Sequence, residues 1–107
     1  MSGTFGEMGS LLKQAQEMQR ELDRVRTELR EKLFEGSAGG GVVKIWVTGD
    51  RQISKVEISP EVFAAGNKQV LEEMLLAALR DGIGRATRHA EESLAKVTGG
   101  MKLPGLF

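Results

Sequence analysis

The side chains that could do chemistry are few, and they form no catalytic set. The chain has one histidine, His89, and neither cysteine nor tyrosine. No second histidine stands at the spacing of a metal site, and no serine lies in the Gly-x-Ser-x-Gly turn of a nucleophile. The pairs Glu72–Glu73 and Glu91–Glu92 are neighbours that point about 100° apart on a helix, so neither converges on one group. We therefore expect no catalytic residue, no metal site, no cofactor and no enzymatic activity, with His89 on a solvated helix face.

A glycine-rich segment at 36–41 has the composition of a phosphate-binding loop but the wrong context. A P-loop needs Gly-Lys-Ser/Thr after a strand and at the start of a helix. Here the glycines lead into an alternating apolar pattern, and Lys44 lies inside that pattern. The segment predicts a turn between strands, and we expect no small-molecule substrate.

Lysine and arginine give the most informative pattern. The chain has 15 basic and 15 acidic residues, and this net charge of zero argues against a broadly basic nucleic-acid coat. Four residues share one face of a predicted C-terminal helix, diluted by Asp81 and Glu92: Arg85, Arg88, His89 and Lys96. A solvated face of mixed charge explains them, and contact with nucleic-acid phosphates is the alternative.

Phosphate contact favours duplex DNA over single strands, because the chain has few aromatic residues on which bases could stack. A single weak basic face would bind poorly, but two copies held in a dimer act together through effective concentration. The candidate DNA contacts are Lys13, Arg20, Arg24, Arg80, Arg85, Arg88 and Lys96.

A long helix from about Ser10 to Arg30 must position the first of these residues. Its apolar residues repeat in steps of 4 and 3, the 3.5-residue period of a coiled-coil seam, which predicts a partner helix from a second copy. The alternative is that the seam packs inside its own domain. The predicted dimer interface is Leu11, Ala15, Met18, Leu22, Val25 and Leu29.

The remaining pattern predicts strands followed by a second long helix. Residues 43–48 and 55–58 alternate as strands, with a hairpin turn at 49–51. Pro60 ends the second strand, and residues 60–63 predict an extended or single-turn segment. Asn67 caps a helix over about 68–97. Its expected apolar face is Leu75, Leu79, Ile83, Ala86, Ala90, Leu94 and Val97.

Two glycines lie inside that last helix. Gly82 and Gly84 each cost about 1 kcal/mol of helix stability relative to alanine. Close backbone packing or a kink explains them better than a ligand does.

The length of 107 residues predicts a single domain with a small core, which self-association would help to stabilise. We expect residues 1–9 to be frayed, because three glycines punctuate them, and residues 99–107 to form a tail broken by glycine and proline. No apolar run approaches the ~20 residues of a membrane helix, and the first twenty residues lack the pattern of a secretory signal. The expected location is the cytoplasm, with no membrane partner.

Five segments, in order along the chain, carry a resemblance to a known family. They are Met8–Gln19, Gly39–Ile45, Val56–Pro60, Leu71–Ala78 and Gly100–Gly105. They are similar to the opening helix, two strands, final helix and Met-x-Leu-Pro-Gly tail of the YbaB/EbfC family of nucleoid-associated proteins. The match spans nearly the whole chain, but the family offers no motif that fixes individual DNA contacts.

The resemblance implies an α+β fold with the order helix, three antiparallel strands, helix, in which residues 33–37 form the first strand. It implies a bacterial homodimer, cytoplasmic and located at the nucleoid, that binds double-stranded DNA without enzymatic activity. It also implies a role in nucleoid organisation and gene expression. This chain departs from the family pattern at Gly82 and Gly84 and in its short tail after Pro104.

Our first hypothesis is a dimeric nucleoid-associated protein that binds duplex DNA mainly through phosphate contacts. The alternative is a protein-interaction module whose long helix and apolar tail dock on a replication, repair or transcription factor.

Overall fold

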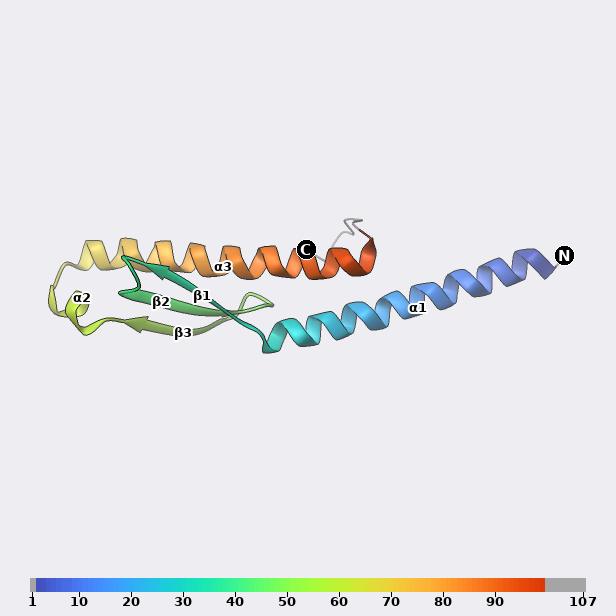
Figure 1. Cartoon of the computed structure of the whole chain (residues 1–107), viewed down its shortest axis with the longest axis horizontal. Coiled ribbons are helices and arrows are strands. Elements are labelled where there is room, and N and C mark those ends of the chain that lie inside the picture. The colour runs from blue at the N-terminus through green and yellow to red at the C-terminus, as the bar shows by residue number, and fades with distance from the viewer. Residues whose placement is uncertain (1, 100–107) are drawn as a thin grey trace.

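Two long helices and a three-stranded antiparallel sheet make up the computed structural model, which describes residues 2–99 (Figure 1). The observed order confirms the predicted α+β fold, including a first strand that begins at Leu33. The elements are α1 (Ser2–Glu31), β1 (Leu33–Ala38), β2 (Val43–Thr48), β3 (Ile53–Ile58), α2 (Pro60–Ala64) and α3 (Lys68–Thr98).

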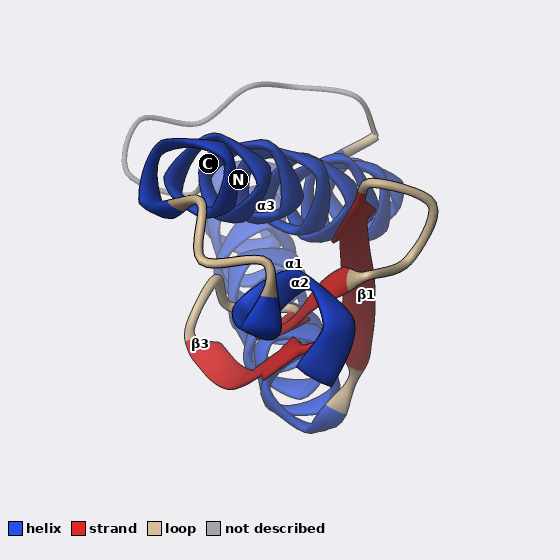
Figure 2. Cartoon of the chain, turned by 90° about the vertical axis from the view of Figure 1, so that its left-hand side faces the viewer, coloured by secondary structure: helices blue, strands red, loops and turns tan. Residues whose placement is uncertain are grey.

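The central strand, β2, supplies the middle of the hydrophobic core. It pairs antiparallel with both neighbours, in the order β1-β2-β3. Val43, Ile45 and Val47 are fully buried on one side, while the residues between them stay partly exposed, as the alternation predicts. α3 packs extensively over β1 and β2 but not over β3, which lies at the end of the sheet away from α3 (Figure 2).

Short side-chain caps start the helices that follow the sheet. The Asn67 side chain accepts a hydrogen bond from the backbone N–H of Val70 at 3.1 Å, so α3 begins where the capping pattern predicts. Ser59 caps α2 in the same way, and the segment from Pro60 is a short helix, in keeping with the single-turn alternative.

A glycine pair brings α3 against β1. Gly36 and Gly82 are both buried, and a Cβ atom added to Gly36 would lie 2.3 Å from the backbone of Ala78 and of Gly82. Gly82 therefore serves close backbone packing, as predicted. Gly84 has no such neighbour, because a Cβ there would meet only the end of the Arg88 side chain at 3.6 Å.

The first helix divides into a packed half and a projecting half. Leu22, Val25 and Leu29 are buried against Ala90 and Leu94 of α3. Toward its N-terminus α1 extends away from the rest of the chain (Figure 1), and Leu11 is 64% exposed. The overall extent of 78 Å by 20 Å by 17 Å reflects this projection.

The sequence predicted irregular segments at both ends of the chain, and the structure describes only the first of them. α1 begins at Ser2, so the predicted frayed segment at 1–9 is wrong for residues 2–9, which are helical. Glycine weakens a helix by about 1 kcal/mol per residue but does not stop it as proline does, and this segment contains no proline. The predicted tail beyond Gly99 lies outside the described residues.

The close contact between α3 and β1 can be tested with two glycine variants. We expect Gly36→Ala to lower the free energy of unfolding by about 3 kcal/mol, because the methyl group would displace the α3 backbone. We expect Gly84→Ala to raise it by about 1 kcal/mol, because the position is open and helical. Urea denaturation followed by circular dichroism measures both. Equal effects of the two substitutions would contradict the role given to Gly36.

Candidate nucleic-acid interface

Arginine, lysine and histidine side chains gather along α3 where it adjoins β1 and α1. Arg85, Arg88 and His89 line one hollow with residues of β1, and His89 and Lys96 line the groove between α1 and α3. Lys32, just after α1, joins them, because its Nζ atom lies 3.3 Å from Nε2 of His89. We call these five residues the cationic row; its charge is carried by the two arginines and the two lysines.

His89 sits at the junction of three elements rather than on a solvated face. It is half-buried, its ring centroid lies 5.0 Å from that of Phe34, and Lys32 contacts its ring nitrogen. The expectation of a solvated histidine is therefore wrong. Sequence reasoning also missed Lys32, because its place in the row depends on a contact between residues 57 positions apart.

The Asp81 carboxylate binds the edge of β1 and also pairs with Arg85 of the row. Its carboxylate accepts a hydrogen bond from the backbone N–H of Ser37 at 3.0 Å and another from Nε of Arg85, also at 3.0 Å. The Ser37 N–H lowers the pKa of Asp81, and the nearby Arg85 and Arg88 lower it further. Desolvation of the carboxylate raises this pKa and so offsets part of the decrease. Arg85 is thus partly neutralised, whereas Arg88 makes no ion pair with any residue in 2–99.

Arg24 is held by two carboxylates of its own helix. Its guanidinium lies 2.7 Å from Glu21 and 2.6 Å from Glu28. Hydrogen bonds and charge attraction from Glu21, and then from Glu28, raise the pKa of Arg24 above its usual value, and Arg24 in turn lowers the pKa of Glu21. Contact with a phosphate would require Arg24 to leave both partners.

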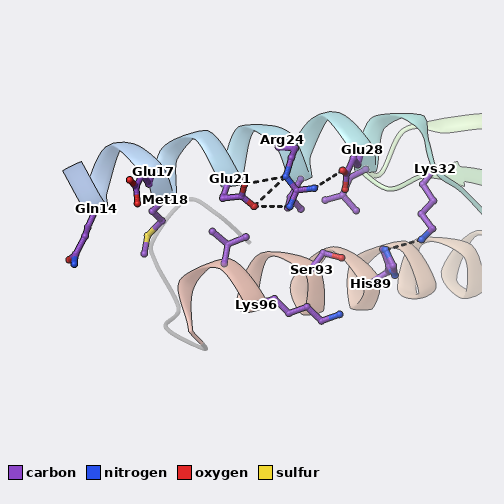
Figure 3. Close-up of a pocket in the computed structure, with 13 residues that line it drawn as sticks. Gln14, Glu17, Met18, Glu21, Arg24, Glu28, Lys32, His89, Ser93 and Lys96 are labelled. Atoms are coloured by element: carbon purple, nitrogen blue, oxygen red, sulfur yellow. Dashed lines mark hydrogen bonds and ion pairs between the residues drawn. The ribbon is translucent and has the colours of Figure 1, made fainter. Parts of the chain in front are cut away.

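The groove between α1 and α3 is lined by charged side chains of both signs (Figure 3). Its volume is about 740 Å³, and its apolar floor includes Met18, Val25 and Val97. The α1 side carries Glu17 and the Arg24 guanidinium with its two partners, Glu21 and Glu28, and Lys32 follows at its end. His89 and Lys96 lie on the α3 side. The carboxylates of the groove disfavour a phosphate backbone inside it, so Arg85 and Arg88, which lie in the hollow beside β1, are the residues of the row best placed for DNA contact.

The other candidate DNA contacts do not join the cationic row. Lys13 and Arg20 lie on the side of α1 opposite the residues that pack on α3, and Arg80 lies on the other side of α3 from Arg85. None of these three makes an ion pair with a residue of the described segment. From the predicted set, one copy of the chain therefore brings together Arg85 and Arg88 in the hollow beside β1, and Arg24 and Lys96 in the groove between α1 and α3.

Comparison with known proteins identifies the family that carries this surface. The model of the YbaB/EbfC DNA-binding family matches residues 5–101. The chain belongs to that family. A nucleoid-associated protein of Acetivibrio thermocellus is 41% identical over 106 residues, which cover 98% of this chain and 94% of the relative. One of Alkaliphilus metalliredigens is 36% identical over 105 residues, covering 98% and 92%.

A solved structure supports the fold of this YbaB/EbfC chain. The crystal structure of the uncharacterized protein HP0035 from Helicobacter pylori matches with a TM-score of 0.71 and 22% sequence identity. The match covers 90% of this chain and 97% of the other. It confirms the arrangement of the two helices and the sheet.

DNA binding, rather than catalysis, is the activity named for the YbaB/EbfC family. Within residues 2–99 no three metal-binding side chains lie close enough to hold an ion. The helices of that segment are also too short or too polar to cross a membrane.

The contact between Asp81 and β1 predicts a pH-dependent stability for this family member. Because folding lowers the pKa of Asp81, its stabilisation is full above the ordinary value near 3.8 and is lost as pH falls through the folded value. We expect Asp81→Asn to lower the free energy of unfolding by about 1 kcal/mol at pH 7, and the difference from the unmodified protein to shrink toward about pH 2. Denaturant titrations across this range measure it. Glu92→Gln in the same hollow is the control, and a pH-independent loss in Asp81→Asn would contradict the charge-based explanation.

Proposed function

We propose that this protein is a homodimeric nucleoid-associated protein that binds duplex DNA mainly through phosphate contacts made by the cationic row. The observation that carries the proposal is the row itself, which runs along α3 from the hollow beside β1 to the groove beside α1, in a chain of a DNA-binding family. Binding would contribute to nucleoid organisation and gene expression, at the nucleoid in the cytoplasm.

The composition and length of the row suit the DNA backbone. From Arg85 to Lys96 it spans about 16 Å at 1.5 Å per residue, comparable with the roughly 12 Å width of the major groove. Long cations on a helix side reach phosphates at a groove edge without reading bases. The one aromatic ring in contact with the row, Phe34, is half-buried against His89 and is not an open surface for base stacking.

Two copies are needed because one row is weak. Asp81, Glu35 and Glu92 line the same hollow as Arg85 and Arg88 and reduce the local positive charge. A second copy doubles the number of phosphate contacts and holds the second row near the same DNA.

The predicted dimer interface on α1 is only partly available to such a second copy. Leu22, Val25 and Leu29 are covered by α3 of the same chain, and Met18 is half-buried. Leu11 and Ala15 are exposed, so they form the portion of that predicted interface that a partner can still reach. The interface on α1 stays a prediction.

The alternative role in protein interaction has one observation in its favour. Met8, Leu11 and Leu12 on the projecting half of α1 are all more than half exposed. A replication, repair or transcription factor bound there would persist after nuclease treatment of a lysate, whereas partners held through DNA would be lost.

Salt dependence tests the phosphate mechanism. We expect the affinity for a fluorescent duplex to fall steeply with salt, and Arg88→Gln to reduce the slope of log affinity against log salt by about 1 per copy, because one phosphate contact is lost. Fluorescence anisotropy measures both. Lys68→Gln, at the far end of α3 and paired with Glu72, is the matched control and should leave the slope unchanged. A slope independent of salt, or equal slopes for Arg88→Gln and the unmodified protein, would refute contact through the row.

A further inference from the structure

The groove between α1 and α3 has an apolar floor that no other segment within residues 2–99 fills (Figure 3). Met18 and Val97 pack against the core between the two helices, but each is only half-buried, so part of both side chains faces the groove. The volume of about 740 Å³ lies in the range of roughly 300–1,000 Å³ that is typical of ligand sites. The groove therefore has room for several side chains, and covering its floor is favourable.

α3 ends beside this groove. Its last turns supply Lys96 and Val97 to the lining, and the helix ends at Thr98. Gly99 follows with a left-handed φ of 66°, and its backbone N–H donates to the carbonyl of Ala95. A left-handed residue at this position turns the chain away from the helix axis. The residues after Gly99 therefore start next to the groove.

The sequence of residues 100–107 suits an apolar groove. It reads Gly-Met-Lys-Leu-Pro-Gly-Leu-Phe, with one charged residue, Lys102. Pro104 fixes its own φ, so holding this segment in one conformation costs less entropy than it would without proline. The large apolar residues of the segment are Met101, Leu103, Leu106 and Phe107.

The segment is long enough to follow the groove. Figure 3 shows Glu17 and Met18 toward one end of the groove and Lys32 and His89 at the other. On α3 the lining runs from Val97 back to His89, which is about 12 Å at 1.5 Å per residue. The six residues 100–105 reach up to about 20 Å at roughly 3.3 Å each.

A free carboxylate lies where the segment would enter. Glu21 and Glu28 both bind Arg24, whereas Glu17 makes no ion pair within residues 2–99. Glu17 adjoins Met18, which packs on the same core cluster as Val97, so it lies near the end of α3. Lys102 comes three residues after Gly99 and is within reach of this carboxylate.

Attachment to α3 favours this segment over one from another molecule. A segment joined to its site by a short linker has an effective concentration in the millimolar range. Weak contacts are then sufficient to keep it bound, and a segment that is not attached lacks this advantage.

We propose that residues 100–107 dock in the groove between α1 and α3 of the same chain. The segment runs from the end of α3 toward Lys32, with Lys102 at Glu17 and its apolar side chains on the floor. Docking adds contacts between α1 and the end of α3, and so holds the projecting half of α1 in a fixed direction. It leaves Arg85 and Arg88 uncovered, because they line the hollow beside β1.

A single nitroxide label locates the segment. The chain has no cysteine, so Gly105→Cys provides one labelling site in the full-length protein. In two-dimensional NMR spectra we expect the label to abolish the amide signals of Val25 and Glu28 and to leave those of Leu11 and Leu12. A segment docked on the projecting half of α1 would give the reverse pattern, and a free segment would weaken both sets alike. Either result would overturn docking in the groove.

A tail variant tests the apolar contact without altering the core. In the labelled protein, Leu103→Asp should restore the Val25 and Glu28 signals, because a carboxylate is costly to bury on an apolar floor. Leu103→Met is the matched control, since it keeps an apolar side chain of similar volume, and it should leave both signals lost. Identical spectra for the two variants would contradict the contact.

Charge exchange tests the placement of Lys102. Lys102→Glu alone and Glu17→Lys alone each place like charges together, and each should recover part of the lost Val25 and Glu28 signals. The double variant restores opposite charges and should abolish the two signals again. Glu91→Lys, on the side of α3 opposite His89, is the control and should have no effect. Signals that stay lost in both single variants would overturn the pairing of Lys102 with Glu17.

A mixed sample distinguishes the same chain from a second copy. Labelled chains without isotope enrichment are refolded together with enriched chains that carry no label. Docking within one chain predicts that the enriched chains keep their Val25 and Glu28 signals. Loss of these signals would show that the segment crosses to a partner, and would overturn docking in the same chain while leaving the proposed function intact.

Discussion

The close approach of α3 to β1 at Gly36 and Gly82 organises the rest of the structure. A side chain at Gly36 would overlap the α3 backbone, so only the glycine pair allows the helix to lie this near the strand. The approach brings Asp81 within hydrogen-bonding distance of Ser37 and sets the Phe34 ring against His89. The cationic row therefore exists as a surface because a helix and an edge strand are in backbone contact.

The same contact leaves the sheet unevenly covered. A helix can lie over about two strands, since packed elements are about 10 Å apart and strands about 4.8 Å. α3 is drawn to the β1 side by the glycine pair, so β3 receives no helix and its apolar residues stay exposed. The covered strand β1 and the uncovered strand β3 are thus two consequences of one packing arrangement.

Local sequence signals were sufficient for β2 and for the starts of α2 and α3, but not for the start of α1 or for the contacts between elements. Asn67 and Ser59 fix helix starts by hydrogen bonds within three residues, and the alternation of β2 reports burial directly, so both were predictable. The seam of α1 was harder, because its period shows that one side is apolar but not what covers it. Its second half packs on α3 and its first half does not, a division set by where α3 ends. The contact of Lys32 with His89 depends entirely on the fold and had no local signal.

Ion pairing, rather than net charge, decides which cations can meet a phosphate. Fifteen basic and fifteen acidic residues give no net charge, yet the two signs are not paired evenly. On α1, Arg24 lies between two glutamates, whereas on α3 Arg88 and Lys96 make no ion pair within residues 2–99. An unpaired cation that meets a phosphate releases counterions from the DNA, but at Arg24 the phosphate would have to replace carboxylates already 2.6–2.7 Å away. A neutral chain can therefore present cations that are free to meet a phosphate, and within residues 2–99 of this chain α3 supplies two of them, Arg88 and Lys96, although acidic residues lie nearby.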